Sequence, residues 1–385
     1  MREGYKITEL GEIPESWDVV NLKSIVINYD SKRIPLKSED RSDTQGIYPY
    51  YGAQGIIDFI DKYIFDGEYL LVAEDGENVK SRKYNIAFIA KGKFWLNNHA
   101  HILQSNEKSE IYFLKNLLNF ISIKEFITGQ AQPKLNKSAL ESIRILLPPL
   151  PEQQKIAEIL TTVDDKIDII NIQIIQIQEL KKGLMQQLLT RGIGHTKFKD
   201  SVLGEIPESW EVINLDEIAK VTTGNKDTQN KVEDGLYPFF VRSQTIEKIN
   251  SYSFDGESVL TAGDGVGVGK VFHYINGKFD YHQRVYNIYG FNDIAGQYFF
   301  NYFKKNFIHQ VNKYNAKGSV DSVRMEMITK MKILLPPLPE QHTIASIFIY
   351  IDEKLDILET KRKTYIDLKK GLMQQLLTGK IRVKL

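Results

Sequence analysis

The chain of 385 residues contains no cysteine, which excludes disulfide bonds and zinc sites built from thiolates. It contains no run of about 18 apolar residues, the length of a membrane-spanning helix. Its first ten residues, MREGYKITEL, lack the apolar core of a signal peptide. We therefore expect a cytoplasmic protein without a membrane partner. Its length predicts two or three domains, and an apolar content of 42% is enough to build their cores.

The chain also lacks an excess of either charge. It has 50 basic and 49 acidic residues, for a net charge of +1. This balance argues against a protein that coats DNA by charge alone. It leaves open a local basic surface, because a nucleic-acid footprint depends on where the charges lie.

Motifs for covalent chemistry are missing as well. The seven histidines show no HExxH or other paired metal spacing. The segment Asp264–Lys270 resembles a phosphate-binding loop, but it lacks the first glycine, and Val271 stands where a magnesium-binding Ser or Thr is needed. A glycine-rich turn is the better interpretation. Both double prolines read Leu-Pro-Pro-Leu, unlike the Asn-Pro-Pro-aromatic loop of an adenine methyltransferase. We predict that the chain holds no metal and is not an enzyme.

What the chain does contain is a long internal repeat. Two motifs recur at a separation of 188 residues: ILLPPLPEQ at 145–153 and 333–341, and LKKGLMQQLLT at 180–190 and 368–378. A third motif, GEIPESW, occurs at 11–17 and 204–210. Repeats of this kind decide the architecture, so the chain is interpreted as two copies of one plan.

Each copy carries a stretch in which apolar residues recur at alternating spacings of four and three. This period of 3.5 residues predicts a coiled-coil seam. The seam residues in the first copy include Ile156, Leu160, Val163, Ile167, Ile170 and Ile174. Those in the second copy include Ile344, Phe348, Ile351, Leu355 and Leu358. We expect two helices of about 38 residues each that pair antiparallel, with one globular module at each end. Lys181 and Lys369 occupy equivalent seam positions, and we expect them to snorkel toward solvent.

The remaining residues predict two mixed modules. Short β-branched and aromatic runs lie between Gly, Asp and Asn turns and indicate strands, whereas 111–128 and 294–311 have helical spacing. The predicted fold class is therefore α/β (α+β), with two tandem domains. The predicted division is 1–150 and 193–338 for the domains, and 151–192 and 339–385 for the helices.

The modules share a framework but differ in their polar loops. Trp95–His99, for example, stands opposite Asp280–Arg284. Such loops suit a binder whose halves read different targets, although neutral drift of surface loops explains any single difference equally well. Residue types that hydrogen-bond base edges or phosphates favour DNA contact. The candidates are Arg82, Lys83, Asn98, His99, Lys134, Arg242, Gln244, Lys270, His282, Arg284 and Lys317.

The doubled set of GEIPESW, LLPPLPEQ and LKKGLMQQLLT over essentially the full chain resembles the specificity subunits of type I restriction–modification systems. This resemblance implies two target-recognition domains spaced by an antiparallel coiled coil. It implies recognition of a bipartite site in double-stranded DNA, one half per domain. The implied partners are two DNA adenine methyltransferase subunits and motor-nuclease restriction subunits. No cofactor is then expected on this chain: S-adenosylmethionine belongs to the methyltransferase, and ATP and Mg²⁺ belong to the restriction subunit.

Two other functions stay open at this point. A coiled-coil scaffold with two protein-binding heads would show the same helices and the same repeated modules. An enzyme of unrecognised type is disfavoured by the missing catalytic motifs. A neighbouring methyltransferase gene, or sequence-specific DNA binding by the assembled complex, would favour the specificity subunit over the scaffold.

Overall fold

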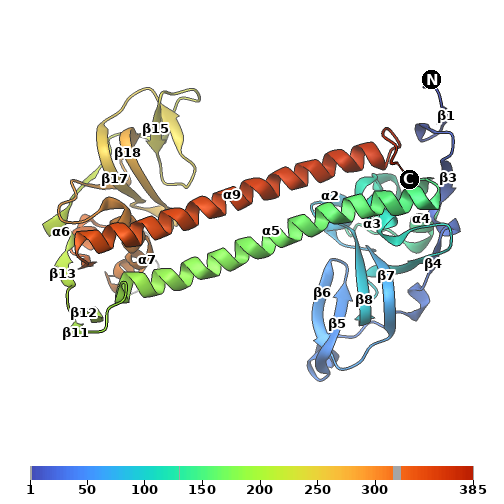
Figure 1. The fold of residues 1–385 in the computed structure, drawn as a ribbon, viewed down its shortest axis with the longest axis horizontal. Helices are drawn as coiled ribbons and strands as arrows, with labels where there is room; N and C mark the ends of the chain where they lie inside the picture. The colour runs from blue at the N-terminus through green and yellow to red at the C-terminus, as the bar shows by residue number, and fades with distance from the viewer. Residues whose placement is uncertain (1, 130, 315–321, 385) are drawn as a thin grey trace. The chain divides into compact units, whose positions relative to one another are not determined.

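The computed structural model describes residues 2–129, 131–314 and 322–384. Contacts divide the chain into two units, of which unit 1 comprises Met1–Asn171 with Thr360–Leu385 and unit 2 comprises Ile172–Glu359. Each unit holds one mixed domain and one end of each of two long helices, α5 (Leu150–Arg191) and α9 (Leu338–Leu376) (Figure 1).

The domain of unit 1 is built on a six-stranded sheet in the order β4-β9-β7-β8-β5-β6. Its neighbours are antiparallel except for β5 and β8, which are parallel. The strands of the unit are β1 Tyr5–Thr8, β2 Gly11–Pro14, β3 Asp18–Asn21, β4 Val26–Asn28, β5 Gln45–Gly52, β6 Gly55–Ile60, β7 Phe65–Ala73, β8 Ala87–Leu96, β9 Ala100–Ser105 and β10 Arg144–Leu147. The shorter helices are α1 Ser38–Ser42, α2 Glu77–Ser81, α3 Ile111–Phe120 and α4 Lys137–Ser142.

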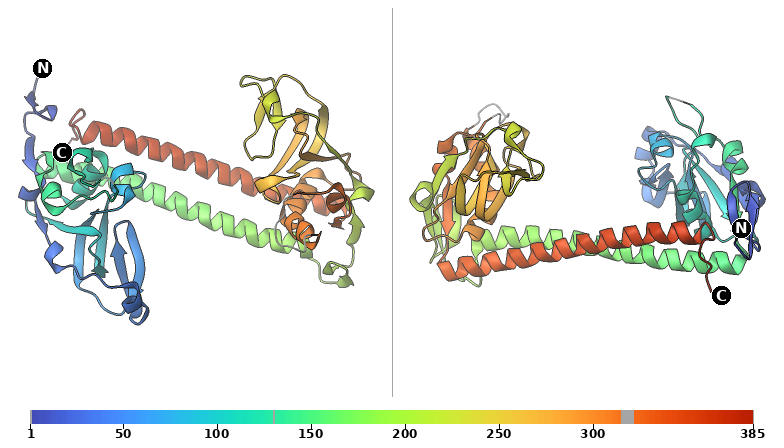
Figure 2. Two further views of the ribbon diagram at one scale, coloured as in Figure 1. Left: turned by 180° about the vertical axis from the view of Figure 1, so that it is seen from behind. Right: turned by 90° about the horizontal axis from the view of Figure 1, so that it is seen from above.

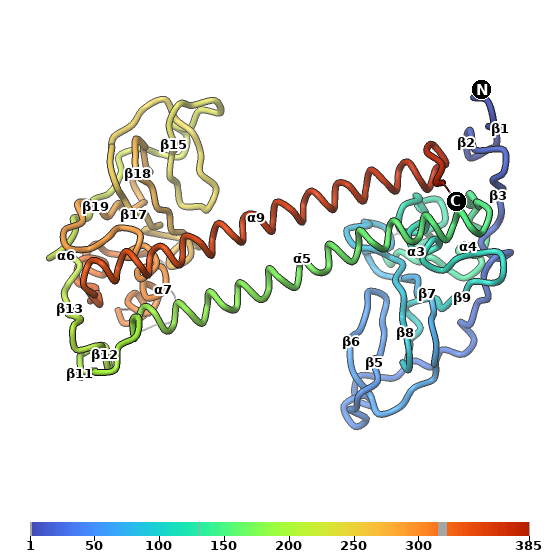
Figure 3. Tube along the Cα trace, viewed as in Figure 1, coloured from blue at the N-terminus to red at the C-terminus, as the bar shows by residue number. Residues whose placement is uncertain are grey.

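The domain of unit 2 repeats this topology. Its six-stranded sheet has the order β14-β19-β17-β18-β15-β16, and β15 and β18 are again the parallel pair. Figure 3 labels four of these strands, β15, β17, β18 and β19. The strands are β11 Phe198–Ser201, β12 Gly204–Pro207, β13 Glu211–Asn214, β14 Lys220–Thr223, β15 Tyr237–Phe240, β16 Glu247–Ile249, β17 Phe254–Ala262, β18 Phe272–Tyr281, β19 Val285–Tyr289 and β20 Lys332–Leu335. The helices are α6 Leu215–Ile218, α7 Gly296–Tyr314 and α8 Met325–Thr329. The predicted tandem α+β domains are confirmed.

Each sheet separates two apolar layers, because alternate residues of a strand face opposite sides. In unit 1, Leu70 and Val72 of β7 belong to the core that includes α3 and the helix ends, whereas Leu71 belongs to an aromatic core with Phe65 and Phe94. In unit 2, the residues of β17 divide between the α7 core and a second aromatic core in the same way.

The repeated motifs meet where the domain joins the long helices. In unit 1 the indole Nε1 of Trp17 donates to Glu152 Oε2 at 2.9 Å, and in unit 2 Trp210 donates to Glu340 Oε2 at 2.9 Å. Both indoles are fully buried. The Trp ends GEIPESW and the Glu belongs to LPEQ, so the two motifs are the halves of one joint.

The glutamine of LPEQ fixes the same joint from another side. Gln153 accepts a hydrogen bond from the backbone N–H of Glu110 and donates to the carbonyl of Pro148. Gln341 makes the equivalent bonds with Ala295 and Pro336. The glutamine thereby ties the start of each long helix to the loop before α3 or α7.

A basic residue beyond each helix end completes the joint. Arg382 bonds Glu152 through Nε at 2.6 Å and Nη2 at 2.7 Å, and His195 Nε2 lies 2.8 Å from Glu340 Oε1. The chain reaches both positions through glycines with φ of +65° and +70°, namely Gly192 and Gly379. A Cβ on Gly192 would lie 2.3 Å from Glu340 Oε1, so glycine is required by space as well as by conformation.

The two long helices run antiparallel within each unit (Figure 2). The predicted seam residues Ile156, Leu160, Val163, Ile170, Ile174, Ile344, Phe348, Ile351 and Leu358 are buried, whereas Ile167 and Leu355 are half-buried. The expectation that the seam lysines snorkel is wrong. Lys181 pairs with Asp352 in unit 2, and Lys369 pairs with Asp164 at 2.5 Å in unit 1, because each partly buried ammonium finds a carboxylate on the opposite helix.

The predicted helix 111–128 is also wrong beyond Phe120. Arg82 Nη2 donates to the carbonyls of Leu118 and Asn119 at 2.9 and 2.8 Å, which satisfies the last turn of α3. The side chain of Asn119 bonds the backbone of Ile86 and Ala87 at the start of β8. In unit 2 the corresponding helix α7 extends to Tyr314. Among the described residues, no helix is long and apolar enough to cross a membrane.

Candidate nucleic-acid interface

Three segments of unit 1 converge beyond its sheet. The backbone N–H of Glu74, after β7, donates to the carbonyl of His99, in the turn between β8 and β9, at 2.9 Å. The N–H of Leu135 donates to the carbonyl of Glu74 at 2.7 Å. We call residues 74–76, 97–99 and 133–135 tip 1.

The same three segments converge in unit 2. The N–H of Gly263 donates to the carbonyl of Arg284 at 2.8 Å, and the N–H of Val323 donates to the carbonyl of Gly263 at 2.7 Å. We call residues 263–265, 282–284 and 322–324 tip 2. The backbone of the tip is therefore part of the repeated framework, and the units differ in most of its side chains, although both keep an Asp-Gly pair, Asp75-Gly76 and Asp264-Gly265.

Polar side chains of tip 1 pair across the converging segments. His99 Nδ1 lies 2.8 Å from Asp75 Oδ2, and Lys134 Nζ lies 3.1 Å from Glu74 Oε1. Asn98, His99 and Lys134 are exposed. The side chain of Asn97, which is buried, accepts from the N–H of His99 at 2.8 Å and fixes the turn.

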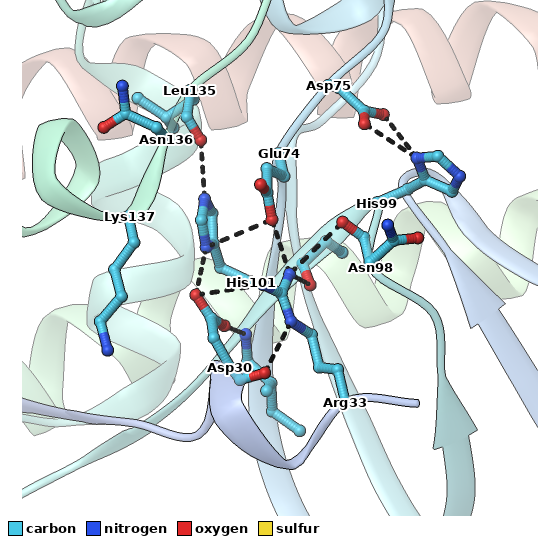
Figure 4. A network of polar contacts seen from close by, with 12 residues as sticks. Asp30, Arg33, Glu74, Asp75, Asn98, His99, His101, Leu135, Asn136 and Lys137 are labelled. Atoms are coloured by element: carbon cyan, nitrogen blue, oxygen red, sulfur yellow. Dashed lines mark hydrogen bonds and ion pairs between the residues drawn. The ribbon is translucent and has the colours of Figure 1, made fainter. Parts of the chain in front are cut away.

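A network of buried charges supports tip 1 (Figure 4). His101 is fully buried, with Nδ1 at 2.6 Å from Asp30 Oδ2 and Nε2 at 2.7 Å from the carbonyl of Leu135. Both ring nitrogens therefore face oxygen atoms, a carboxylate on one side and a backbone carbonyl on the other. Arg33 Nη1 donates to Glu74 at 2.6 Å and to the carbonyl of Ala100 at 2.8 Å.

These contacts determine how the buried carboxyls titrate. Burial alone would raise the pKa of Asp30, but the hydrogen bond and charge of His101 outweigh it and hold the pKa below its ordinary value. Burial opposes ionisation of Glu74 in the same way, and its hydrogen bond to Arg33, with His101 nearby, lowers the pKa. Both side chains are therefore carboxylates at neutral pH.

Tip 2 is organised by one carboxylate. Asp264 Oδ1 accepts from Arg242 Nη1 at 2.9 Å, and Asp264 Oδ2 lies 3.7 Å from Arg284 Nε. Close by, Gln244 Nε2 donates to the carbonyl of Lys270 at 2.7 Å. Arg242, Gln244, Lys270 and Arg284 are exposed. Two guanidinium groups thus share a carboxylate at the surface of the unit.

His282 is a buried residue of tip 2. It is 3% exposed, and its Nδ1 accepts from the N–H of Arg284 at 2.9 Å, which is the role of Asn97 in tip 1. Burial lowers the pKa of His282, and the charge of Arg242 adds to this effect. Burial also lowers the pKa of His273, whose Nε2 lies 3.0 Å from the carbonyl of Ser243.

The structure therefore divides the predicted DNA-contacting residues. It brings Asn98, His99 and Lys134 together at tip 1, and Arg242, Gln244, Lys270, His282 and Arg284 together at or beside tip 2. Arg82 instead bonds the end of α3, and burial lowers the pKa of its guanidinium. Lys83 is exposed beside Tyr84, and Lys317 lies outside the described residues. DNA contact by any of these residues stays a prediction.

The candidate list omitted the acidic residues that position the basic ones. Asp75 and Asp264 occupy the same place in the two copies, within Glu74-Asp75-Gly76 and Gly263-Asp264-Gly265. A search for differences between the copies passes over a residue that is the same in both. The recurrence of this aspartate next to divergent loops is the signal in the sequence that could have identified it.

The side chains at the tips carry hydrogen-bonding groups. Guanidinium, imidazole and amide groups at a surface can contact base edges or phosphates. Within 2–129, 131–314 and 322–384, no group of three or more His, Asp or Glu side chains is placed to hold a metal ion.

The sequence is similar to those of type I restriction specificity proteins. A family model described as "Type I restriction modification DNA specificity domain" matches residues 14–179 and again residues 207–367. The chain is 31% identical to a putative type I restriction enzyme specificity subunit, MjaX, of Methanocaldococcus jannaschii, over 99% of this chain and 97% of that protein. It is 28% identical to a putative type I restriction enzyme specificity subunit of Haemophilus influenzae over 89% and 88% of the two chains.

A solved structure shares the fold. The crystal structure of a type I restriction–modification S subunit from M. genitalium aligns with a TM-score of 0.71 at 15% identity. The alignment covers 98% of this chain and 99% of that one. The repeated domains with their long helices are thus an architecture found in a solved protein.

Proposed function

The chain belongs to the type I restriction–modification DNA specificity family, and we propose that it reads a bipartite site in double-stranded DNA, one half-site per domain. One observation carries this proposal. The two tips have the same backbone arrangement and the same recurring aspartate, yet they present different hydrogen-bonding groups. A protein that reads two different half-sites with one framework needs this combination.

The proposed role is recognition without catalysis. The relatives above are named specificity subunits, which favours a division of labour between this chain and its partners. We propose that two DNA adenine methyltransferase subunits, which use S-adenosylmethionine, assemble with this chain. Restriction subunits that use ATP and Mg²⁺ would join the same complex. The chain itself would then need no cofactor.

A methylome tests the proposal. The chain is produced with its methyltransferase subunit in a host that lacks DNA methylation, and modified bases are read along the genome. The expected result is a single motif with two specified halves, an unspecified spacer and N6-methyladenine in both halves. A control culture carries the methyltransferase subunit alone and should show no motif. An assembled complex that marks no motif would contradict the proposal and favour a scaffold.

A further inference from the structure

We propose that Arg284 and Arg242 read guanine bases in the half-site of unit 2 and that Asp264 orients both side chains. In unit 1, His99 and Asp75 occupy the positions equivalent to Arg284 and Asp264. This inference rests on the proposed function and adds to it the residues that determine specificity and the kind of base that unit 2 reads.

The position of Arg284 is fixed by the framework. The turn between β18 and β19 is held by the N–H of Arg284 bonding to His282 Nδ1 and by its carbonyl accepting from Gly263. The turn between β8 and β9 is held at His99 by the equivalent bonds to Asn97 and Glu74. The side chain at this place therefore projects from a defined backbone in both units.

The ion pairs at the tips are too exposed to serve mainly for stability. The side chain of Arg284 is 66% exposed, that of Arg242 is 45% exposed and that of His99 is 52% exposed. Exposed ion pairs contribute little to folding, because water screens them. The recurrence of an aspartate at this place in both units then calls for another reason. Restricting the orientation of a long basic side chain is such a reason.

A carboxylate beside the arginines also selects what they bind. Asp264 partly neutralises the guanidinium groups and repels the phosphates of a DNA backbone. An arginine that only clamped phosphate would bind better without it. A guanidinium held by a carboxylate still presents its remaining N–H groups as a fixed fork, which matches O6 and N7 of guanine in the major groove. The geometry of tip 2 therefore favours base reading.

Tip 1 presents a different group at the same place. With Nδ1 bonded to Asp75, His99 presents Nε2 as its second ring nitrogen. One ring nitrogen makes a single hydrogen bond to a base, whereas the guanidinium fork of an arginine makes two to guanine. The two units should accordingly require different bases.

The test uses the complex of the full chain with its methyltransferase subunit. The wild-type motif is read from the methylome, and the half-site of unit 2 is assigned by replacing that domain. Binding is then measured on duplexes in which each position of the motif is changed in turn. Three variants are compared with the wild type: Arg284→Ala, Arg242→Ala and Asp264→Asn. Lys199→Ala on β11, an exposed lysine on the hairpin of the helix joint, is the matched control.

The expected wild-type half-site of unit 2 contains guanine. Arg284→Ala and Arg242→Ala should each lose about tenfold of discrimination at one guanine–cytosine pair of that half-site. Discrimination in the half-site of unit 1 should stay unchanged in both variants. Lys199→Ala should leave discrimination in both half-sites unchanged. Thermal unfolding at the wild-type temperature shows that a variant is folded.

Asp264→Asn separates a positioning role from a structural one. Removal of the carboxylate should reduce discrimination at the same base pairs while binding to unrelated duplexes is retained or strengthened, because a repulsive charge is gone. Equal loss of binding to all duplexes would mark Asp264 as structural and contradict the inference.

Two further outcomes overturn the inference while the proposed function stands. In the first, a bipartite motif is found but Arg284→Ala weakens binding to every duplex alike, which marks a phosphate contact. In the second, the half-site of unit 2 contains no guanine. If the assembled wild-type complex marks no bipartite motif at all, the proposed function fails and the inference falls with it.

Discussion

The two tips rest on different supports although their backbones are alike. In unit 1 the buried His101 bonds the carbonyl of Leu135 and pairs with Asp30. In unit 2 the equivalent residue is Tyr286, whose hydroxyl donates to the carbonyl of Val323 at 2.9 Å. The framework thus requires a donor to this carbonyl but not a charge. A neutral phenol and a charged network are alternative solutions to the same requirement.

The joints between domain and helix, in contrast, are built from the same residues in both units. Trp17 with Glu152 and Trp210 with Glu340 keep the same residues, the same atoms and the same distance. A buried indole N–H needs an acceptor, and the space around it is filled, so few substitutions are tolerated there. At the tips, by contrast, Asn98, His99, Lys134 and Arg284 are exposed. Packing therefore keeps the joints alike, and exposure lets the tips diverge.

The largest expected effect on stability comes from replacing the buried tryptophan of a joint. Trp17→Ala and Trp210→Ala should each lower the free energy of unfolding of their own unit by about 3–5 kcal/mol, because a fully buried indole leaves a cavity. Hydrogen exchange of the full chain, followed in β7 for unit 1 and in β17 for unit 2, measures the two units separately. Similar losses in the two units are expected. A loss in one unit without a comparable loss in the other would show that the joints are not equivalent.

A smaller effect distinguishes the supports of the tips. His101→Phe removes the hydrogen bonds of His101 to the buried Asp30 and to the carbonyl of Leu135, although Arg33 stays 3.6 Å from Asp30, and should cost unit 1 about 3 kcal/mol. Tyr286→Phe removes one hydrogen bond and should cost unit 2 about 1 kcal/mol. The same exchange measurement compares them. Equal costs would contradict the inference that the buried polar network of unit 1 is more costly to disrupt than the single hydrogen bond of unit 2.

Acidification should produce the smallest difference in stability between the units. As the pH falls, unit 2 should lose stability first. His273 and His282 have lowered pKa values in the folded chain, so the unfolded chain takes up protons more readily. Their contribution to stability is present above about pH 6.5 and is lost as the pH falls from there toward the folded pKa values. Asp30 and Glu74 also have lowered pKa values, so their contribution to unit 1 is complete above about pH 4.5 and is lost below it.

Exchange protection measured from pH 8 to pH 4, corrected for the intrinsic rate, checks this order. Unit 2 should begin to lose protection as the pH falls below about 6.5, before unit 1 does. Earlier loss in unit 1 would contradict the assignment. Glu110 in unit 1 acts in the opposite sense, since burial raises its pKa, and it limits the size of the change in that unit.

Much of the fold could be predicted from the sequence because it is encoded locally. The apolar spacing of four and three identified both long helices, and the repeated motifs identified two modules of one plan. The strand order and the parallel pairing of β5 with β8 could not be predicted, because pairing of distant strands leaves no periodic signal. The early end of α3 was missed because it depends on Arg82, which lies far away in the sequence.

The candidate site could be predicted only in part. Divergent loops between shared motifs led to Asn98, His99 and Arg284, which the structure places at the tips, and residue type led to Arg242, which lies beside tip 2. No local pattern indicates that the guanidinium of Arg82 bonds α3 or that His282 is buried, because both facts depend on contacts between distant segments. Asp75 and Asp264 were visible as a repeated residue, but their pairing with basic side chains required the folded structure.

The central claim is that the joints are interchangeable and that the domains carry the specificity. It is tested most directly by a chain in which Gly204–Gln341 is replaced by a second copy of Gly11–Gln153. Both segments begin with GEIPESW and end with LPEQ, so the junctions keep their residues. In the methylome of this chain with its methyltransferase subunit, we expect the half-site of unit 1 at both ends of the motif. An assembled complex that still marked the original second half-site would contradict the claim.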